Sequence, residues 1–316
     1  GAEELMDHIG HRAEYARQDE PLGTGHAVMM AAPYIEDKEG YVVVLAGDTP
    51  LIREETLSSM VEYAIDGDYS AVALSTIVDD STGYGRIVRT ADGDFDKIVE
   101  HKDATEAERA INEINASMYC FRIDSLIESL KDLANDNAQG EYYLTDTLSI
   151  IKNHGKRVGV YCLDDYTEIL GVNTRQQLSD AERLMRSRIN NFHMDNGVTL
   201  IDPNSTYIGA DVTIGEDTII YPWNVLEGNT YIGANSILYP NNRIVDSTLG
   251  DGVTSQSSVI LESQVGDDTN VGPFAYVRPG SHIGNNVKIG DFVEIKNSRI
   301  GKGTKISHLA YVGDAD

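Results

Sequence analysis

The most regular feature of the chain is an aliphatic residue at every sixth position along much of its C-terminal part. Helices repeat near 3.6 residues and strands near 2, so a sustained period of six predicts one short strand and one corner per hexad, stacked on the neighbouring hexads. Glycine often follows the aliphatic residue, which suits a corner with unusual backbone angles. The pattern predicts a parallel β-helix over residues 197–316. The aliphatic positions are Ile208, Ile214, Ile220, Leu226, Ile232, Leu238 and Ile244, then Val253, Val259, Val265, Val271, Val277, Ile283, Ile289 and Ile295.

The two runs of hexads are separated by nine residues instead of six, between Ile244 and Val253. An inserted loop at one corner would explain the longer interval, so we expect a local insertion there.

A helical pattern over residues 174–196 precedes the hexads. Ser179 and Glu182 have the spacing of a capping box, and an apolar face includes Leu178 and Phe192. We interpret this segment as a helix that links two domains.

Residues 1–173 alternate between strand-like and helix-like patterns, which predicts an α/β domain. The apolar run 41–45 predicts a buried parallel strand, and Ala-Gly-Asp-Thr-Pro follows it at the edge of the sheet. Ligand sites of open α/β sheets lie at the carboxyl ends of the strands. We therefore expect a site close to Asp48.

The chain has 316 residues, enough for about two domains. With 51 acidic and 25 basic residues, its net charge of −26 argues against nucleic acid and anionic membranes as partners. A phosphate-bearing substrate would then need a divalent cation or well-placed basic groups.

The context of the two cysteines, Cys120 and Cys162, is apolar and predicts buried thiols in a reducing compartment. We expect a cytoplasmic protein. A first strand with a glycine-rich phosphate loop is not evident, and the last hexad carries no cap, so we also expect both ends to be truncated.

Three places in residues 1–173 offer candidate chemistry. The loop from Gln18 to Ala27, QDEPLGTGHA, brackets its centre with glycines that let backbone amides approach a base or phosphate; an ordinary loop capped by Thr24 is equally compatible. Asp48 could be a ligand of Mg²⁺ or an ordinary turn residue. Asn173 could supply a second oxygen ligand or begin a helix. These alternatives stay open at this point.

In the repeat, Arg278 and Lys296 each follow an aliphatic position and are eighteen residues apart. Three hexads per coil would place them at equivalent corners of adjacent coils. There they could bind one phosphate together, or they could be ordinary corner residues exposed to solvent. Tyr311 lies further along, and His308 could act as a general base at neutral pH or serve the structure alone.

Many motifs, in order along the whole chain, resemble one family, the bacterial bifunctional N-acetylglucosamine-1-phosphate uridyltransferases and glucosamine-1-phosphate acetyltransferases. The resemblance implies a Rossmann-like nucleotidyltransferase domain, N-terminally incomplete, and a left-handed parallel β-helix, C-terminally incomplete, that forms a homotrimer. The motifs are LGTGHA (22–27), GDTPLI (47–52), TGYGRIVR (82–89), IVEHKDAT (98–105), EIN (113–115), NAQGEYYLTD (137–146), GVN (171–173), FAYVRPG (274–280), GDFVEIKN (290–297) and SHLAYVGDA (307–315).

For the first domain, the resemblance implies uridylyl transfer from UTP to N-acetylglucosamine 1-phosphate, with release of pyrophosphate and Mg²⁺ as cofactor. It carries residue roles over to this chain: Asp48 and Asn173 for Mg²⁺, Gln18, Gly23 and Thr24 for uridine, and Gly85, Glu100, Asn115 and Asn173 for the uridylyl-site substrates.

For the β-helix, the resemblance implies acetyl transfer from acetyl-CoA to glucosamine 1-phosphate, which supplies the first reaction for cell-wall precursors. Arg278 and Lys296 would bind the sugar phosphate beside Tyr311, and His308 would be the catalytic base.

The chain also departs from the family pattern. The glycine-rich triphosphate loop and the coils that bind coenzyme A are not evident, so we expect weak ligand binding and little turnover. Ala46 replaces a larger residue of some relatives, and Ala116-Ser117 replaces the more familiar Thr-Gly.

Other functions are compatible with parts of the pattern. A non-catalytic trimerisation scaffold or a glucose-1-phosphate nucleotidyltransferase with a regulatory β-helix are the alternatives. A zinc-dependent hydratase would need more histidines than His282 and His308 across the coils.

Overall fold

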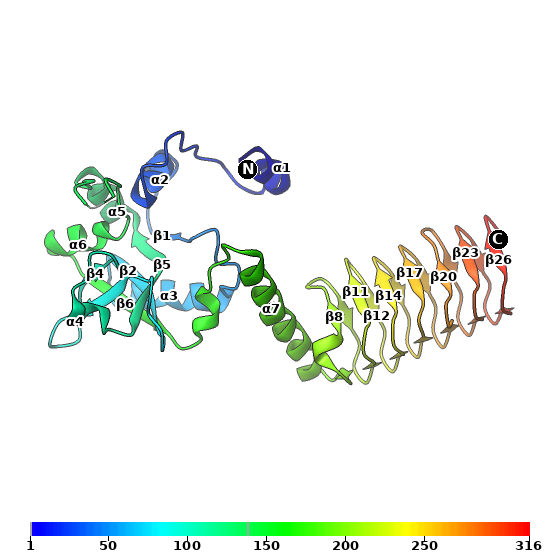
Figure 1. Cartoon of the computed structure of the whole chain (residues 1–316). Coiled ribbons are helices and arrows are strands. Elements are labelled where there is room, and N and C mark those ends of the chain that lie inside the picture. Colours follow the sequence, from blue (N-terminus) through cyan, green and yellow to red (C-terminus); the bar gives the residue numbers. More distant parts are fainter. Residues whose placement is uncertain (1, 138) are drawn as a thin grey trace. The chain divides into compact units, whose positions relative to one another are not determined.

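The structure is a computed structural model that describes residues 2–137 and 139–316 (Figure 1). Ala138 of the NAQGEYYLTD motif therefore lies outside the described residues. The chain divides into two compact units, the first ending at Gln177 and the second beginning at Leu178. In the described part, no helix has the length and apolar composition that a membrane crossing requires.

The first unit is built on a mixed six-stranded sheet of order β4-β3-β5-β2-β6, with β1 also paired to β5. Strands β2 and β6 are parallel, and the other pairs are antiparallel. The strands are β1 Tyr41–Val44, β2 Ala71–Ile77, β3 Arg86–Arg89, β4 Phe95–Val99, β5 Glu113–Arg122 and β6 Val158–Leu163.

Helices cover both faces of this sheet, which gives three layers. Side chains of α2, α5 and α6 join one apolar core, and side chains of α3 join the core on the opposite face. The helices of this unit are α1 Ala2–Ile9, α2 Thr24–Ala31, α3 Glu54–Asp66, α4 Glu106–Arg109, α5 Ile123–Lys131 and α6 Asp146–Asn153, with 3₁₀ turns at Gly10–Arg12, Ala32–Tyr34 and Tyr166–Ile169.

Strand β1 corrects one prediction. It pairs antiparallel with β5, and its residues are half-buried rather than buried. Its side chains alternate between the two cores, with Val42 and Val44 in one and Tyr41 and Val43 in the other. The continuous apolar run therefore reflects a strand covered on both faces, which does not require a parallel neighbour.

The two cysteines differ in their surroundings. Cys120 on β5 is buried, and burial raises the pKa of its thiol to about 11. Cys162 is exposed, so the prediction of two buried thiols is wrong for this residue. Its strand, β6, is the last of the sheet order and pairs with β2 alone among the described strands.

Helix α7, Arg175–Asp195, lies within the segment predicted as helical, residues 174–196. The backbone amide of Gln177 donates to Thr174 Oγ1 at 3.1 Å, and the amide of Thr174 donates to Gln177 Oε1 at 2.9 Å. This reciprocal pair is the capping box. The predicted box at Ser179 is wrong because Ser179 lies inside the helix.

The buried face of α7 also differs from the predicted one. Leu178 and Phe192 are 56% and 64% exposed, whereas Ala181, Asn190 and His193 are buried. The helix reaches the apolar core of the second unit through smaller contacts, Ile189 and Met194 among them.

The second unit is a solenoid with three parallel sheets, and Figure 1 shows its coils stacked in sequence order. Inward aliphatic residues build a single core through the solenoid, and β16 is the exception because its inward residue is Ser255. The first face consists of β7 Thr199–Leu200, β10 Ile219–Ile220, β13 Ile237–Leu238, β16 Thr254–Ser255, β19 Asn270–Val271, β22 Lys288–Ile289 and β25 Lys305–Ile306.

The other two faces have the same organisation. The second face consists of β8 Tyr207–Ile208, β11 Val225–Glu227, β14 Arg243–Val245, β17 Val259–Leu261, β20 Tyr276–Val277, β23 Glu294–Lys296 and β26 Tyr311–Gly313. The third face consists of β9 Thr213–Ile214, β12 Tyr231–Ile232, β15 Thr248–Leu249, β18 Gln264–Val265, β21 His282–Ile283 and β24 Arg299–Ile300, and a 3₁₀ turn at Pro203–Ser205 precedes β8.

The nine-residue interval is not an insertion. Leu249 stacks on Ile232, and Ile260 stacks on Ile244, so β15 and β17 continue their faces without an extra loop. The inward positions shift because the interval between them shortens to five residues at some corners, as from Ile244 to Leu249. Val259, predicted to point inward, is half-buried beside Ile260.

Candidate functional site

The glycine-bracketed loop packs against a segment more than a hundred residues further along. The amide of Tyr142 donates to the Leu22 carbonyl at 2.8 Å, and the amide of Gly25 donates to the Tyr142 carbonyl at 2.7 Å. Gly23 has φ +109°, and a Cβ there would lie 2.6 Å from the Tyr142 oxygen. Only glycine fits this close approach.

The structure brings Gln18, Gly23 and Thr24 together. Gln18 Nε2 donates to the Gly23 carbonyl at 3.2 Å, and Thr24 Oγ1 accepts from the Leu144 amide at 3.1 Å. Thr24 is the first residue of helix α2, Thr24–Ala31. Its hydroxyl thus connects the start of α2 to the segment that contains Leu144.

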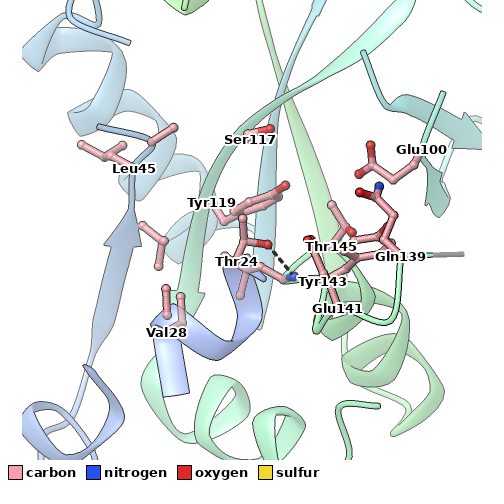
Figure 2. A pocket seen from close by; sticks show the side chains of 14 residues that line it. Thr24, Val28, Leu45, Glu100, Ser117, Tyr119, Gln139, Glu141, Tyr143 and Thr145 are labelled. Atoms are coloured by element: carbon pink, nitrogen blue, oxygen red, sulfur yellow. Dashed lines mark hydrogen bonds between the residues drawn. The ribbon is translucent and has the colours of Figure 1, made fainter. Parts of the chain in front are cut away.

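A cavity of about 410 Å³ lies beside this loop (Figure 2). Thr24, Leu45 and Glu100 line it from different elements, together with Tyr119 and Tyr143. Figure 2 shows Tyr119 between Thr24 and Ser117, and Glu100 near Gln139. The cavity therefore joins the loop to Glu100, one of the residues predicted to hold the sugar.

Asp48 and Asn173 meet at the edge of the sheet. Asp48 Oδ2 and Asn173 Nδ2 lie 3.4 and 3.6 Å from the position that a Cβ on Gly171 would occupy. The Val172 amide donates to the Asp48 carbonyl at 2.7 Å. Both side chains line a cavity of about 350 Å³, with Asn115 on its wall.

These two side chains fit a magnesium ion. The Asp48 carboxylate offers hard oxygen ligands. A half-turn of the Asn173 side-chain amide exchanges its nitrogen and oxygen, so this residue can offer an oxygen ligand as well. In the described residues, no group of three or more histidine, cysteine, aspartate or glutamate side chains could hold a metal. Mg²⁺ commonly uses one or two protein ligands and takes the rest from water and substrate phosphates, so two suffice.

Gly85, Glu100 and Asn115 also come together. Both carboxylate oxygens of Glu100 and the Cβ of Asn115 lie 3.5 Å from the position of a Cβ on Gly85. The Asn115 amide donates to the Gly85 carbonyl at 2.9 Å, and Asn115 Nδ2 donates to the Tyr119 hydroxyl at 2.8 Å. Polar groups from three separate segments therefore converge beside Gly85.

Two carboxyl groups near this cluster hold their protons more tightly than usual. Burial, then the charges of Asp103 and Asp146, raise the pKa of Glu100. Burial, then Asp103, raise the pKa of Asp146. The pocket therefore disfavours negative charge on its own side chains.

The sequence prediction missed Tyr119 and Tyr143 as lining residues. Tyr119 lies four residues after Asn115 on β5, and an even spacing on a strand could have indicated a shared face. Ser117, at φ +57°, adopts the left-handed conformation that glycine favours, and Asn115 Oδ1 accepts from its amide at 3.2 Å. Ser117 therefore takes the conformation that the more familiar glycine would supply.

In the solenoid, Arg278 and Lys296 lie on adjacent coils of the second face. Val277 and Ile295 are register partners, and the Arg278 amide donates to the Ile295 carbonyl at 2.8 Å. The sequence prediction missed their acidic partners: Glu294 lies 2.8 Å from Arg278, and Asp314 lies 3.1 Å from Lys296.

Tyr311 and His308 lie at the next coil. Tyr311 is the register partner of Glu294, and its hydroxyl occupies the place of a Cβ on Gly313, the partner of Lys296. His308 is exposed at the corner between β25 and β26, which leads into the second face. The basic pair and Tyr311 thus share one face, and His308 lies at its border.

Comparisons with known proteins agree with this geometry. A nucleotidyl transferase family matches residues 2–191, and the bacterial transferase hexapeptide family (six repeats) matches residues 262–297. The protein named Bifunctional protein GlmU from Clostridium beijerinckii is 55% identical over 317 aligned residues, covering 100% of this chain and 69% of that relative. The chain belongs to the GlmU family.

Other GlmU proteins give the same result. Those of Acetivibrio thermocellus and Clostridium acetobutylicum are each 56% identical, with 100% and 96% of this chain covered and 68% and 66% of the relative. The chain thus spans about two thirds of the length of these GlmU proteins. The predicted family is confirmed, and with it a bifunctional transferase of UDP-N-acetylglucosamine synthesis.

Proposed function

We propose that residues 1–173 transfer uridylyl from UTP to N-acetylglucosamine 1-phosphate, with Mg²⁺ held by Asp48 and Asn173. The observation that supports this most is that the Asp48 and Asn173 side chains lie close together beside Gly171, in a cavity that Asn115 also lines. Residues from distant parts of the chain converge there on one sheet edge, where α/β folds bind ligands.

In this reaction, a phosphate oxygen of the sugar attacks the α-phosphorus of UTP, and pyrophosphate leaves. When bound, Mg²⁺ neutralises charge on the phosphates, which matters in a chain of net charge −26. Gln18, Gly23 and Thr24 hold the uridine, and the loop packing described above fixes their positions. Gly85, Glu100 and Asn115 hold the amino sugar.

The solenoid, residues 197–316, transfers acetyl from acetyl-CoA to glucosamine 1-phosphate in this proposal. Arg278 and Lys296 bind the sugar phosphate, which replaces Glu294 and Asp314 as their partner. The amine attacks the thioester carbonyl and the carbon–sulfur bond breaks. His308 takes the proton from the nitrogen and passes it to the sulfur, so coenzyme A leaves as the thiol. Its product is the sugar phosphate that the first unit consumes.

The solenoid also carries a surface that supports the homotrimer. Phe274, Phe292 and Leu309 are 55%, 56% and 76% exposed and stack at one corner of successive coils, with the two rings 5.2 Å apart. Exposed apolar side chains in contact commonly mark protein interfaces.

We assign residues 174–196 to the link between the two domains. We assign the protein to the cytoplasm, in agreement with its two free cysteines.

Calorimetric titration with UDP-N-acetylglucosamine tests the first reaction site. Binding should tighten when Mg²⁺ is added, and Asp48→Asn should remove this gain. A scaffold would bind neither this ligand nor glucosamine 1-phosphate, and a glucose-1-phosphate enzyme would bind UDP-glucose at least as tightly. Either result would refute the proposal.

The same titration tests the second site. Arg278→Ala should weaken the binding of glucosamine 1-phosphate and leave the binding of UDP-N-acetylglucosamine unaffected.

A further inference from the structure

We propose that Glu168 is a positioning residue that holds the two metal-binding segments in register. The proposal rests on the function proposed above, because it assumes that Asp48 and Asn173 bind the cation. Glu168 lies in the 3₁₀ turn Tyr166–Ile169, five residues before Asn173. Its carboxylate reaches the start of helix α3, which follows the loop that carries Asp48.

Glu168 caps the N-terminus of α3, although it lies on a segment remote in sequence. Its Oε2 accepts from the Arg53 amide at 3.0 Å and from Thr56 Oγ1 at 2.7 Å. Arg53 is the N-cap residue of α3 and makes no side-chain cap of its own. A carboxylate that accepts the N-cap amide is one half of a capping box, supplied here by a residue more than a hundred positions away.

The contacts of Glu168 are buried. Its side chain is 3% exposed, and Thr56 is buried beneath it. A carboxylate at this depth is stable only when hydrogen bonds and nearby positive charge compensate its desolvation. The helix N-terminus, the Thr56 hydroxyl and the Arg53 guanidinium, whose Nε lies 3.5 Å from Glu168 Oε1, supply these interactions.

Two connections therefore join the same pair of segments. At the metal pair itself, the Val172 amide donates to the Asp48 carbonyl. Further along the chain from Asp48, and before Val172 on the other segment, Glu168 accepts hydrogen bonds from Arg53 and Thr56. Asp48 takes part in the first connection and Asn173 directly follows Val172, so the second connection helps to hold the two segments that carry the ligands.

Weaker contacts from Glu168 would leave the hydrogen bond between Val172 and Asp48 as the main connection between the two segments. Removal of an outer group that orients metal ligands commonly costs about 10–100-fold in metal affinity. We expect this range for Glu168→Gln, which places an amide against the Arg53 side chain, and for Thr56→Val, which keeps the shape but removes the hydroxyl.

Two variants serve as matched controls. Thr56→Ser retains the hydroxyl at the same position. Asp165→Asn removes the charge from an exposed ion pair, 2.8 Å long, between the same two segments, while its Oδ1 still accepts from the Thr167 amide. Exposed pairs of this kind contribute little, so both controls should bind the cation like the unchanged chain.

The test uses the whole chain with Mn²⁺ as the probe, and paramagnetic resonance counts the free ion in the presence of saturating UDP-N-acetylglucosamine. Glu168→Gln and Thr56→Val should raise the Mn²⁺ dissociation constant by about tenfold or more. Affinity for UDP-N-acetylglucosamine in the presence of a chelator should stay within about twofold, since a general loss of structure would lower this affinity as well.

Unchanged Mn²⁺ affinity in either variant, with Asp48→Asn defective, would refute the positioning role and leave the proposed function intact. If Asp48→Asn binds Mn²⁺ normally, the metal site itself is wrong, and both proposals fail. Should Glu168→Gln not fold, Thr56→Val and Thr56→Ser decide the question.

Discussion

Arg278 Nη1 lies 2.8 Å from Glu294 Oε1, one coil further along the second face of the solenoid. Both side chains are 40% exposed, so water screens the pair and its contribution to stability is small. Its consequence concerns binding: a phosphate that approaches Arg278 must compete with a carboxylate already in place.

We predict that Glu294→Gln tightens the binding of inorganic phosphate and glucosamine 1-phosphate several-fold. The substitution removes one negative charge and frees the guanidinium, and like charges near an anion site weaken binding. Titration calorimetry at low and high salt would measure the change, which should be smaller at high salt.

Arg243 and Glu227 form a similar exposed pair of 3.0 Å on the same face, earlier in the solenoid. Glu227→Gln is therefore the matched control and should leave phosphate binding unchanged. Equal effects of the two substitutions would show that net charge, and not the position beside Arg278, determines affinity.

The raised pKa of Glu100 predicts a conflict between stability and binding. Because the folded chain holds this proton more tightly than the unfolded chain, the free energy of unfolding falls as pH rises through and above the ordinary carboxyl range. Glu100→Gln should raise the Tm of the first unit at pH 7 by a few degrees, since ~1 kcal/mol shifts Tm by about 2–4 °C in a domain of this size.

The same substitution should weaken UDP-N-acetylglucosamine binding, whereas Asp146→Asn, also with a raised pKa but outside the proposed contacts, should stabilise without this loss. Scanning calorimetry at pH 4 and pH 7 checks the sign, because the gain should shrink toward pH 4. A larger gain at pH 4 would contradict the assignment.

His193 predicts the opposite dependence on pH in the second unit. Burial lowers its pKa, so the unfolded chain binds its proton more tightly, and stability present at neutral pH is lost as pH falls below about 6.5. His193→Gln should flatten the decrease in urea midpoint between pH 7.5 and pH 5.5. The single tryptophan, Trp223, lies in this unit and reports its unfolding.

His282→Gln is the control for this measurement, because His282 is a partly exposed residue of the third face. Its urea midpoint, measured over the same pH range, gives the effect of glutamine in place of a less buried histidine. If His193→Gln retains the full decrease, other groups cause the acid sensitivity.

The core of the solenoid gives a sharper prediction, because sequence and structure disagree about one pair of neighbours. The period of six places Val259 inside, whereas the structure places Ile260 there, fully buried on Ile244. Ile260→Ala should cost about 2–5 kcal/mol in the free energy of unfolding, as expected for a buried aliphatic truncation. Val259→Ala should cost less than about 1.5 kcal/mol. Urea denaturation measures both losses, and a larger loss for Val259→Ala than for Ile260→Ala would show that Val259 is the inward residue, as the period of six predicts.

This disagreement shows what the sequence can and cannot determine. Strict hexads from Ile208 to Ile244 predict inward positions correctly, because each corner there has the same length. Where a corner loses one residue, only the pairing of Ile260 with Ile244 in the neighbouring coil identifies the inward position. A periodic pattern does not carry this information.

The candidate sites show the same division. Asp48 and Asn173 could be proposed as candidates from local patterns, because each follows an apolar segment, whereas Glu100 is proposed only through the family resemblance. Glu168 could not, since its partners, Arg53 and Thr56, lie more than a hundred residues away and follow no motif. The acidic partner of Arg278 likewise becomes apparent only when adjacent coils are stacked.

Two glycines of the first unit, Gly23 and Gly85, give the last prediction, because the space around their Cα atoms differs. A Cβ on Gly85 would lie 3.5 Å from its nearest neighbours, an ordinary contact, whereas a Cβ on Gly23 would lie 2.6 Å from the Tyr142 oxygen at φ +109°. Gly85→Ala should leave the Tm unchanged or slightly raised, since alanine restricts the unfolded chain. It should nevertheless weaken UDP-N-acetylglucosamine binding, because the new methyl group occupies the space between Glu100 and Asn115. Gly23→Ala should lower both Tm and affinity, and calorimetry with each variant would separate steric exclusion of the sugar from loss of the fold.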